Sequence, residues 1–522
     1  MTDAADLVLT NGEVHTLTDP DETAEAIAVR DGEIVRVGSA YEIDFLAGVD
    51  TRTIDLDGHV LLPGFIDAHT HMEELGKRLV HADLADATSP DEAIEALGER
   101  ADELDSDEEN RGWILGFGYD ESAWDESRYL DRTDLDRVSE TRPVVAFRED
   151  MHTASVNGVT LDRLGDRLPQ GDVRTENGDP TGVLVEDALG PVRAATAPGR
   201  AATRDLLLAA QEYANELGVT GVHDMVRGSH APRVYRDLDS AGEITLRVRI
   251  NYWSDHLDAT IETGLATNHG SEFVRTGAIK TFTDGSIGAR TAKLTEPYAD
   301  ASGGDADGKT TGQWVVPPAE LHELVERADD AGFQVTAHAI GDRAVDEVLD
   351  TYAATDDPGS ARHRIEHAEL PFNGAIDRFA DTGIVASVQP NFLKWADEGG
   401  LYDTKLGDNR RRRSNPLREL HDAGVRLAFG SDCMPLDPLL GVHHAVNAPV
   451  DAQRLPVTDA LRAYTHGAAY AGFDEDRLGT IEPGKRADLV ALDRSPWDQP
   501  GEVEDIDVAA TIVDGEIVHD AR

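Results

Sequence analysis

A short apolar strand followed by an amphipathic helix recurs along most of this 522-residue chain, and this repeat constrains the fold more than any other feature. Thr203 can cap a helix that Gly218 ends, and a strand follows directly at 219–224. The same unit recurs around Gly332, with a strand at 333–338. Eight such units predict an α/β fold of the TIM (β/α)8 barrel type. The expected strands end at His69, Asp224, Tyr252, Lys280, His338, His367, Gln389 and Asp432.

Both ends of the chain carry short β-type runs separated by turns. Asp31-Gly32 is a hairpin signal between two such runs, and the pentapeptide Asp-Gly-Glu-Ile-Val occurs near both termini. Neither end has enough strands for a core of its own, so we expect residues 1–58 and 478–522 to form one composite β-sandwich. The barrel then occupies residues 59–477.

One stretch of the barrel region does not follow the repeat. Residues 73 to about 200 are too many for a single connection between a barrel strand and its helix. We therefore interpret this stretch as an inserted lid or subdomain over the barrel mouth, where long functional insertions commonly occur.

The charge of the chain is strongly acidic, with 101 Asp and Glu against 48 Lys and Arg and a formal net charge of -53. Such a balance argues against a nucleic-acid partner. The acidic residues are dispersed among apolar positions, which predicts a solvated acidic surface that needs salt screening. This surface resembles that of haloarchaeal proteins, and an acidic protein of a mesophile is the alternative.

Other features of the composition restrict the location and the kind of metal site. Cys433 is the only cysteine, which excludes intrachain disulfides and thiolate clusters, so metal binding would depend on His and carboxylates. No apolar run approaches the roughly 18 residues of a membrane span, and the start lacks the pattern of a signal peptide. We expect a soluble, cytoplasmic protein with a small-molecule substrate, no membrane partner and a homodimeric state.

Polar residues stand where the apolar strands end, at the rim where barrel enzymes build their active sites. His69 and His71 are separated by one residue, so an extended strand would present both imidazoles to the same side. A pair of this kind alone is equally compatible with two ordinary histidines near a strand end. His338, His367 and Asp432 end three other strands, and this conjunction indicates a metal site.

Longer motifs surround these residues. They are Pro-Gly-Phe-Ile-Asp-Ala-His-Thr-His at 63–71, Lys280 with Asp284-Gly285-Ser286 and Arg290-Thr291-Ala292, His338-Ala339-Ile340-Gly341-Asp342, Glu366-His367, Gly430-Ser431-Asp432, and the segment 479–489. Together they resemble the amidohydrolase superfamily, and more narrowly the amidohydrolase 3 or YtcJ-like group, which includes N-substituted formamide deformylases. The resemblance covers essentially the whole chain.

The resemblance implies a divalent-metal centre built from these residues. Lys280, one of only seven lysines, would bridge two ions as a carbamate formed with carbon dioxide, since a buried lysine loses its charge readily. The alternative is a mononuclear site in which Lys280 stays a cation paired with Asp284. Nitrogen and oxygen ligands suit zinc, with manganese, iron and cobalt as alternatives. The implied ligands are His69, His71 and Asp432 for one ion and His338 and His367 for the other.

The resemblance also implies the reaction. A metal-dependent hydrolase of this kind would cleave a non-peptide carbon–nitrogen bond in an amide, formamide or cyclic amide. Metal coordination would activate a water molecule and polarise the carbonyl. Asp432 would take a proton from the water and deliver it to the leaving nitrogen. The same scaffold could instead serve an esterase, a lactonase, a deaminase or a non-catalytic assembly protein.

Five further residues are candidates for the pocket or its support. His152 occupies a position where this group often has a histidine near the pocket. Arg290 and Tyr298 follow the fourth expected strand and could reach a substrate oxygen. For these three a purely structural role is equally compatible with the sequence. Asp342 and Glu366 are candidates for orienting neighbouring loops or imidazoles.

Overall fold

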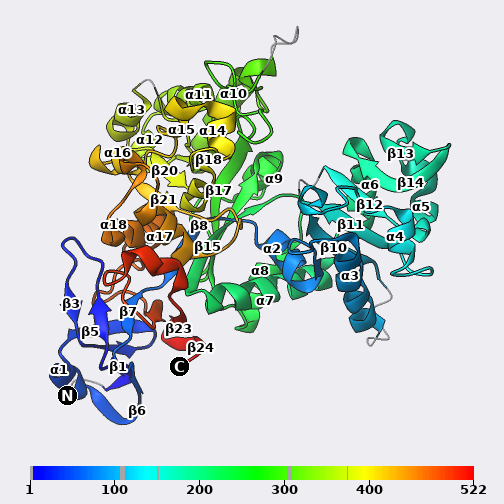
Figure 1. Ribbon diagram of the computed structural model, residues 1–522. Coiled ribbons are helices and arrows are strands. Elements are labelled where there is room, and N and C mark those ends of the chain that lie inside the picture. The colour runs from blue at the N-terminus through cyan, green and yellow to red at the C-terminus, as the bar shows by residue number, and fades with distance from the viewer. Residues whose placement is uncertain (1–3, 106–111, 150–151, 302–308, 373) are drawn as a thin grey trace. The chain divides into compact units, whose positions relative to one another are not determined.

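The computed structural model describes residues 4–105, 112–149, 152–301, 309–372 and 374–522. The chain divides into two compact units, one made of Met1–His71 with Gln211–Arg522 and the other of Met72–Ala210. Each unit has its own sheets and hydrophobic clusters, and Figure 1 labels their elements.

An eight-stranded parallel sheet forms the centre of the first unit, which confirms the predicted TIM barrel (Figure 1). Strands that follow one another in the chain are also neighbours in the sheet, as expected for repeated strand–helix units. Every residue of the strand Val219–Val226 is buried, because helices cover the outside of such a sheet and side chains fill its inside. The strands are β8 (Phe65–Thr70), β15 (Val219–Val226), β16 (Arg247–Trp253), β17 (Val274–Phe282), β18 (Val335–Ala339), β19 (Arg364–His367), β20 (Val385–Val388) and β21 (Leu427–Phe429).

Amphipathic helices separate the barrel strands. The helix before β18 buries Leu321, Val325 and Ala328 on one face, and Gly332, with φ +78°, makes the turn into the strand. This helix and its glycine stop match the strand–helix unit predicted around Gly332. The helices between strands include α8 (Ala231–Ala241), α9 (Leu257–Glu262), α10 (Pro318–Asp330), α11 (Asp342–Ala353), α13 (Ala375–Thr382) and α16 (Leu417–Asp422).

Strands from both ends of the chain pair in one sheet, which confirms the composite β-sandwich. In the six-stranded sheet β24-β23-β22-β7-β2-β3, the late strand β22 (Leu489–Leu492) pairs antiparallel with the early strand β7 (Val60–Pro63). The four-stranded sheet β5-β4-β1-β6 packs on a shared core that includes Leu9, Ile27 and Ile512. The remaining sandwich strands are β1 (Ala5–Thr10), β2 (Glu13–His15), β3 (Thr23–Ala24), β4 (Ala26–Arg30), β5 (Glu33–Gly38), β6 (Ala47–Asp55), β23 (Val508–Val513) and β24 (Glu516–Asp520).

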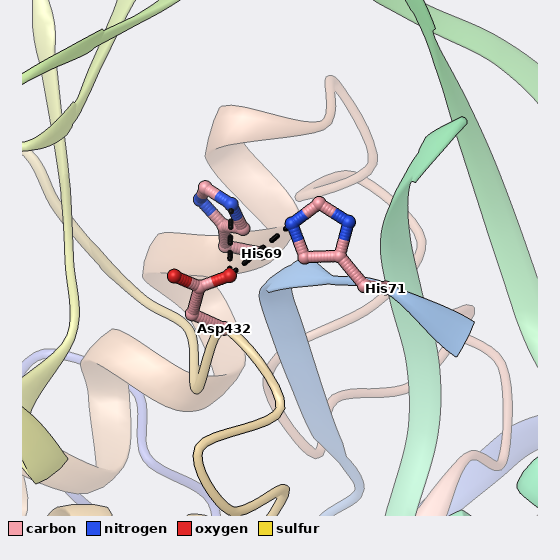
Figure 2. A group of neighbouring side chains, drawn as sticks. All are labelled: His69, His71 and Asp432. Carbon is pink, nitrogen blue, oxygen red and sulfur yellow. Dashed lines mark ion pairs between the residues drawn. The ribbon is translucent and has the colours of Figure 1, made fainter. Parts of the chain in front are cut away.

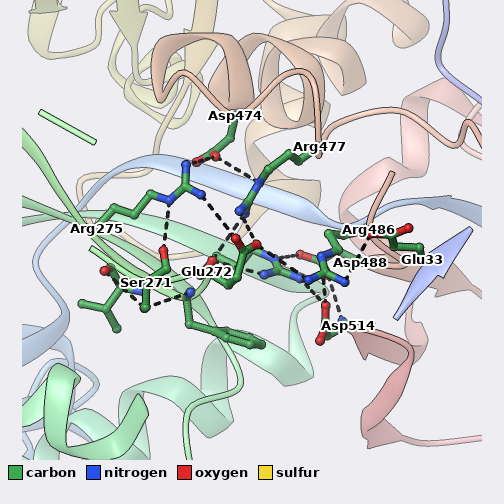
Figure 3. A network of polar contacts seen from close by, with 12 residues as sticks. Glu33, Ser271, Glu272, Arg275, Asp474, Arg477, Arg486, Asp488 and Asp514 are labelled. Carbon is green, nitrogen blue, oxygen red and sulfur yellow. Dashed lines mark hydrogen bonds and ion pairs between the residues drawn. The ribbon is translucent and has the colours of Figure 1, made fainter. Parts of the chain in front are cut away.

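Ion pairs connect the barrel to the sandwich within the first unit, and Figure 3 shows several of their acids and arginines. Arg247 on β16 is buried and donates from Nη2 to Asp488 Oδ1 and to Asp514 Oδ1, both at 2.9 Å. Nearby, Arg275 Nη1 donates to Asp474 Oδ1 at 3.0 Å. Loss of one partner from such a pair leaves a buried charge without compensation.

The second unit, Met72–Ala210, contains a six-stranded sheet in the order β13-β14-β12-β11-β10-β9. Its strands are β9 (Ala82–Asp83), β10 (Ile114–Tyr119), β11 (Val144–Arg148), β12 (Thr153–Val156), β13 (Val173–Glu176) and β14 (Asp179–Val185). Hydrophobic clusters line the sheet, one of them around Leu97 of α3 (Pro90–Asp105). The role of this unit as a lid stays a prediction. Among all described residues, every helix is too short or too polar to cross a bilayer.

Candidate metal centre

Three of the expected ligands meet at the carboxyl ends of β8 and β21 (Figure 2). Each of His69, His71 and Asp432 offers one ligand atom, and these atoms all lie within 4.8 Å of one another. Asp432 Oδ1 is 3.2 Å from His71 Nε2 and 3.5 Å from His69 Nε2. Two imidazole nitrogens and a carboxylate oxygen close enough to bind one ion are a donor set that divalent metals favour.

The other three expected ligands lie beside this group. The His367 ring is 5.2 Å from the His69 ring and 4.5 Å from the His338 ring, measured between centroids. Lys280 is 1% exposed, and among the described residues neither its Nζ nor His367 Nδ1 has a hydrogen-bond partner. A buried polar atom without a partner is costly, so these atoms fit a site that a ligand completes. The structure thus places His338 and His367 beside the group of His69, His71 and Asp432, and the full ligand set with Lys280 stays a prediction.

The electrostatics of these groups also suit a metal. Burial lowers the pKa of His367 to about 3 and holds the pKa of His338 well below its ordinary value, so both imidazoles are neutral and keep a free lone pair. Burial also lowers the pKa of Lys280 to about 8. Burial alone would raise the pKa of Asp432, but its interactions with His69 and His71 lower it below its usual range.

The backbone at two of these residues is unusual. His367 has φ +71° and Asp432 has φ +57°, a left-handed region that residues other than glycine adopt rarely. Local strain of this kind is held in place by surrounding contacts and occurs often at functional sites. The N–H of Asp432 donates to the carbonyl of His69 at 2.8 Å, which joins the loop after β21 to β8.

Asp67 adds a second connection between β8 and this loop. It is fully buried, and its Oδ1 accepts the N–H groups of His69 and Ser431, each at 3.0 Å. Burial raises the pKa of Asp67 to about 7. No role was predicted for Asp67, although an acid two positions before His69 on the same face of the strand was a signal for it.

Glu366 contacts His69, one of the predicted ligands. Its Oε2 lies 2.6 Å from His69 Nδ1, and its Oε1 accepts from Thr336 and Arg364. Burial alone would raise the pKa of Glu366, but Arg364 and His69 hold it well below its usual value. Arg364 was not assigned from the sequence, although a charged residue in an apolar strand was a signal for it.

Asp284 does not pair with Lys280 in the described residues. Its carboxylate accepts three backbone N–H groups, from Lys293 at 2.7 Å, Gly341 at 2.9 Å and Ile340 at 3.0 Å. Burial raises its pKa to about 7. Asp284 therefore ties the loop after β17 to the loop after β18, and the ion pair assumed in the mononuclear alternative is not formed.

Arg290 and Tyr298, the candidates for substrate binding, and Asp342 all form hydrogen bonds with residues of the loop after β17. Arg290 Nη2 donates to Asp300 Oδ2 at 2.6 Å, and the hydroxyl of buried Tyr298 donates to the carbonyl of Ala292 at 2.9 Å. Asp342 Oδ1 accepts the N–H of Thr295 at 2.9 Å, which supports its predicted loop-orienting position. Roles of Arg290 and Tyr298 in substrate binding stay predictions.

Two residues complete the comparison with the sequence. His152 lies in the second unit, is exposed, and its Nδ1 is 3.3 Å from Glu186 Oε2; its place near the pocket stays a prediction. Gln389, at the end of the seventh barrel strand, is buried, and within the described residues neither atom of its side-chain amide has a hydrogen-bond partner. Gln389 was predicted as the end of a strand and had no predicted role.

Known proteins match the chain over nearly its whole length. The Amidohydrolase family model matches residues 52–519. The chain is 31% identical over 536 residues to the putative amidohydrolase YtcJ of Bacillus subtilis, covering 98% of each sequence. It is 30% identical over 554 residues to N-substituted formamide deformylase of Arthrobacter pascens, covering 99% of the chain and 98% of the relative. The solved structure of an uncharacterized metal-dependent hydrolase from Pyrococcus furiosus matches with a TM-score of 0.80 and 30% identity, covering 94% of this chain and 99% of that one.

Proposed function

The chain belongs to the amidohydrolase family, and from this premise we propose that it hydrolyses a small amide, formamide or cyclic amide at the centre formed by the six residues above. It is a metal-dependent hydrolase of carbon–nitrogen bonds other than peptide bonds. The observation that carries the proposal is the convergence of ligand atoms of His69, His71 and Asp432 within 4.8 Å. The buried amine of Lys280 interacts electrostatically with Asp432 and has no hydrogen-bond partner among the described residues.

Zinc is the metal we propose for this centre, because its donors are imidazole nitrogens and carboxylate oxygens. His69, His71 and Asp432 would hold one ion, and His338 and His367 a second. When bound, a divalent metal supplies Lewis acidity toward the substrate carbonyl and the attacking water.

Lys280 is proposed to join the two positions as a carbamate. The neutral amine attacks carbon dioxide, forms an N–C bond and releases one proton, which leaves an anionic group with two oxygen donors. The reaction requires the uncharged amine, and burial favours that form by lowering the pKa of Lys280 to about 8. The absence of a hydrogen bond to its Nζ among the described residues leaves the amine available for this reaction.

Asp432 is proposed as the proton shuttle. Its carboxylate accepts a proton from water as the oxygen bonds to the carbonyl carbon. It then gives that proton to the substrate nitrogen as the carbon–nitrogen bond breaks, which yields a carboxylic acid and an amine. The position of Oδ1, 3.2 Å from His71 Nε2 and 3.5 Å from His69 Nε2, supports this role.

The name of one relative guides the choice of substrate. The relative from Arthrobacter pascens is an N-substituted formamide deformylase, so N-substituted formamides form the first panel to test, followed by small amides and cyclic amides. Protein loaded with zinc in concentrated salt would be assayed for amine release. Turnover that chelation abolishes and zinc restores would support the proposal, whereas release of alcohol from esters alone would favour an esterase.

A further inference from the structure

Arg364 is a charged side chain in the interior of the barrel. It lies on β19, two residues before Glu366, and is 1% exposed. A guanidinium is almost never buried so completely unless acceptors surround it, because its desolvation is costly. The hydrogen-bond partners of Arg364 therefore indicate its function in the barrel.

The first set of contacts leads to His69. Arg364 donates to Glu366 Oε1 from Nε at 3.0 Å and from Nη2 at 2.7 Å. The other oxygen of the same carboxylate, Oε2, lies 2.6 Å from His69 Nδ1. A carboxylate paired with a guanidinium has only acceptor atoms, so the proton of His69 is placed on Nδ1. The lone pair of Nε2 is then directed toward Asp432, at 3.5 Å.

The second set of contacts joins Arg364 to the strands around the imidazole of His69. Arg364 Nη2 also donates to the carbonyl of Ala68, the residue before His69, at 2.6 Å, and to Ser387 Oγ at 2.9 Å. Its Nη1 donates to His223 Nδ1 at 2.8 Å. One side chain on β19 thus bonds to β8, β15 and β20, and it supports both the backbone and the ring of His69.

We infer that Arg364 is a positioning residue for the metal centre: it sets the tautomer of His69 through Glu366 and its placement through Ala68. The inference rests on the proposed metal centre and goes beyond it by assigning part of the metal affinity to a residue that touches neither metal nor substrate. Groups that orient metal-binding histidines typically contribute about 10- to 100-fold to affinity or activity.

The test measures the dissociation constant for Zn²⁺ of metal-free protein by competition with a chromophoric chelator in concentrated salt. Arg364→Met keeps an unbranched apolar chain and removes every donor. It is expected to weaken Zn²⁺ binding at the site of His69, His71 and Asp432 about 10- to 100-fold. Arg247→Met is the matched control, because Arg247 is a buried arginine on a barrel strand that pairs instead with Asp488 and Asp514. The control is expected to lose stability and to keep the wild-type dissociation constant.

Further variants keep the test decisive if Arg364→Met does not fold. Arg364→Lys retains the charge but cannot reach all four partners of the guanidinium. Glu366→Gln keeps the shape of the side chain that joins Arg364 to His69, but it replaces one acceptor oxygen by an NH2 donor. Both are expected to weaken Zn²⁺ binding and to alter the visible spectrum of the Co²⁺-loaded protein. Wild-type affinity and spectrum in a folded variant at Arg364, or equal weakening in Arg247→Met, would overturn the inference. Failure of the wild-type protein itself to bind Zn²⁺ would instead refute the proposed metal centre.

Discussion

Replacing Asp432 by asparagine removes the proposed proton shuttle and preserves most other contacts. The backbone bond from Asp432 N–H to the carbonyl of His69, 2.8 Å, does not involve the side chain. The left-handed backbone at this position, φ +57°, is one that asparagine tolerates well. An amide oxygen can still face the two imidazoles, so the fold should remain intact.

The expected loss in rate follows from the two proton transfers. A positioned general acid–base group contributes about 10²- to 10⁴-fold to a rate. At about 1.4 kcal/mol for each factor of ten, the barrier should rise by roughly 3 to 5 kcal/mol. Asparagine cannot take up a proton from water, so the loss should appear in kcat. Stability should change by less than about 1 kcal/mol, since the backbone contacts persist.

The assay compares kcat, metal content and the free energy of unfolding for wild type and Asp432→Asn on one substrate of the amide panel. Asp437→Asn is the control, because it makes the same chemical change on the same loop. Asp437 caps α17 (Pro438–Asn447) by accepting the N–H of Leu440 at 3.0 Å, and asparagine caps a helix equally well. Unchanged kcat in Asp432→Asn, with metal still bound, would refute the role of this carboxylate; an equal loss in the control would show that the loop is merely perturbed.

Four further outcomes are expected. Lys280→Met should lower the metal content by about one ion per protomer, measured by plasma mass spectrometry, because it removes the bridging group. In metal-free protein without carbon dioxide, burial lowers the pKa of Lys280 from 10.5 to about 8. The unfolded chain therefore binds more protons between these values, and the free energy of unfolding should rise with pH across this window in wild type but not in Lys280→Met, as urea titrations would show. Arg247→Met should lower the free energy of unfolding by about 3 to 5 kcal/mol in chemical denaturation, because it leaves the buried Asp488 unpaired, while kcat is kept. The net charge of -53 should make the thermal midpoint rise from dilute to multimolar KCl, and a flat response would argue against a salt-dependent surface.

Features with a local cause could be predicted from the sequence. The strand–helix repeat follows from residue periodicity, and the alternation of a strand places His69 and His71 on one side. The predicted ligands lie at or next to the ends of their strands, because parallel barrel strands present their carboxyl ends to one rim. Asp432 lies just beyond β21, on a loop whose path local rules do not determine.

Features that depend on contacts between distant segments could not be predicted. Glu366 was expected to orient an imidazole, but its partner His69 is 297 residues away in the chain. Arg364 and Asp67 act through similar distant partners, and neither has a local pattern that indicates which strand it contacts. Arg290 was expected to be able to reach a substrate oxygen; the structure pairs it with Asp300 of the same loop, and its role in substrate binding stays a prediction.

The most direct test of the account is the number of metal ions per protomer in protein purified in concentrated salt without chelator, measured by plasma mass spectrometry. We expect about two ions per protomer, as for a centre bridged by a carbamate on Lys280. One ion would contradict the bridge while leaving a centre at His69, His71 and Asp432. Reproducible absence of metal in protein that remains folded would contradict the central claim.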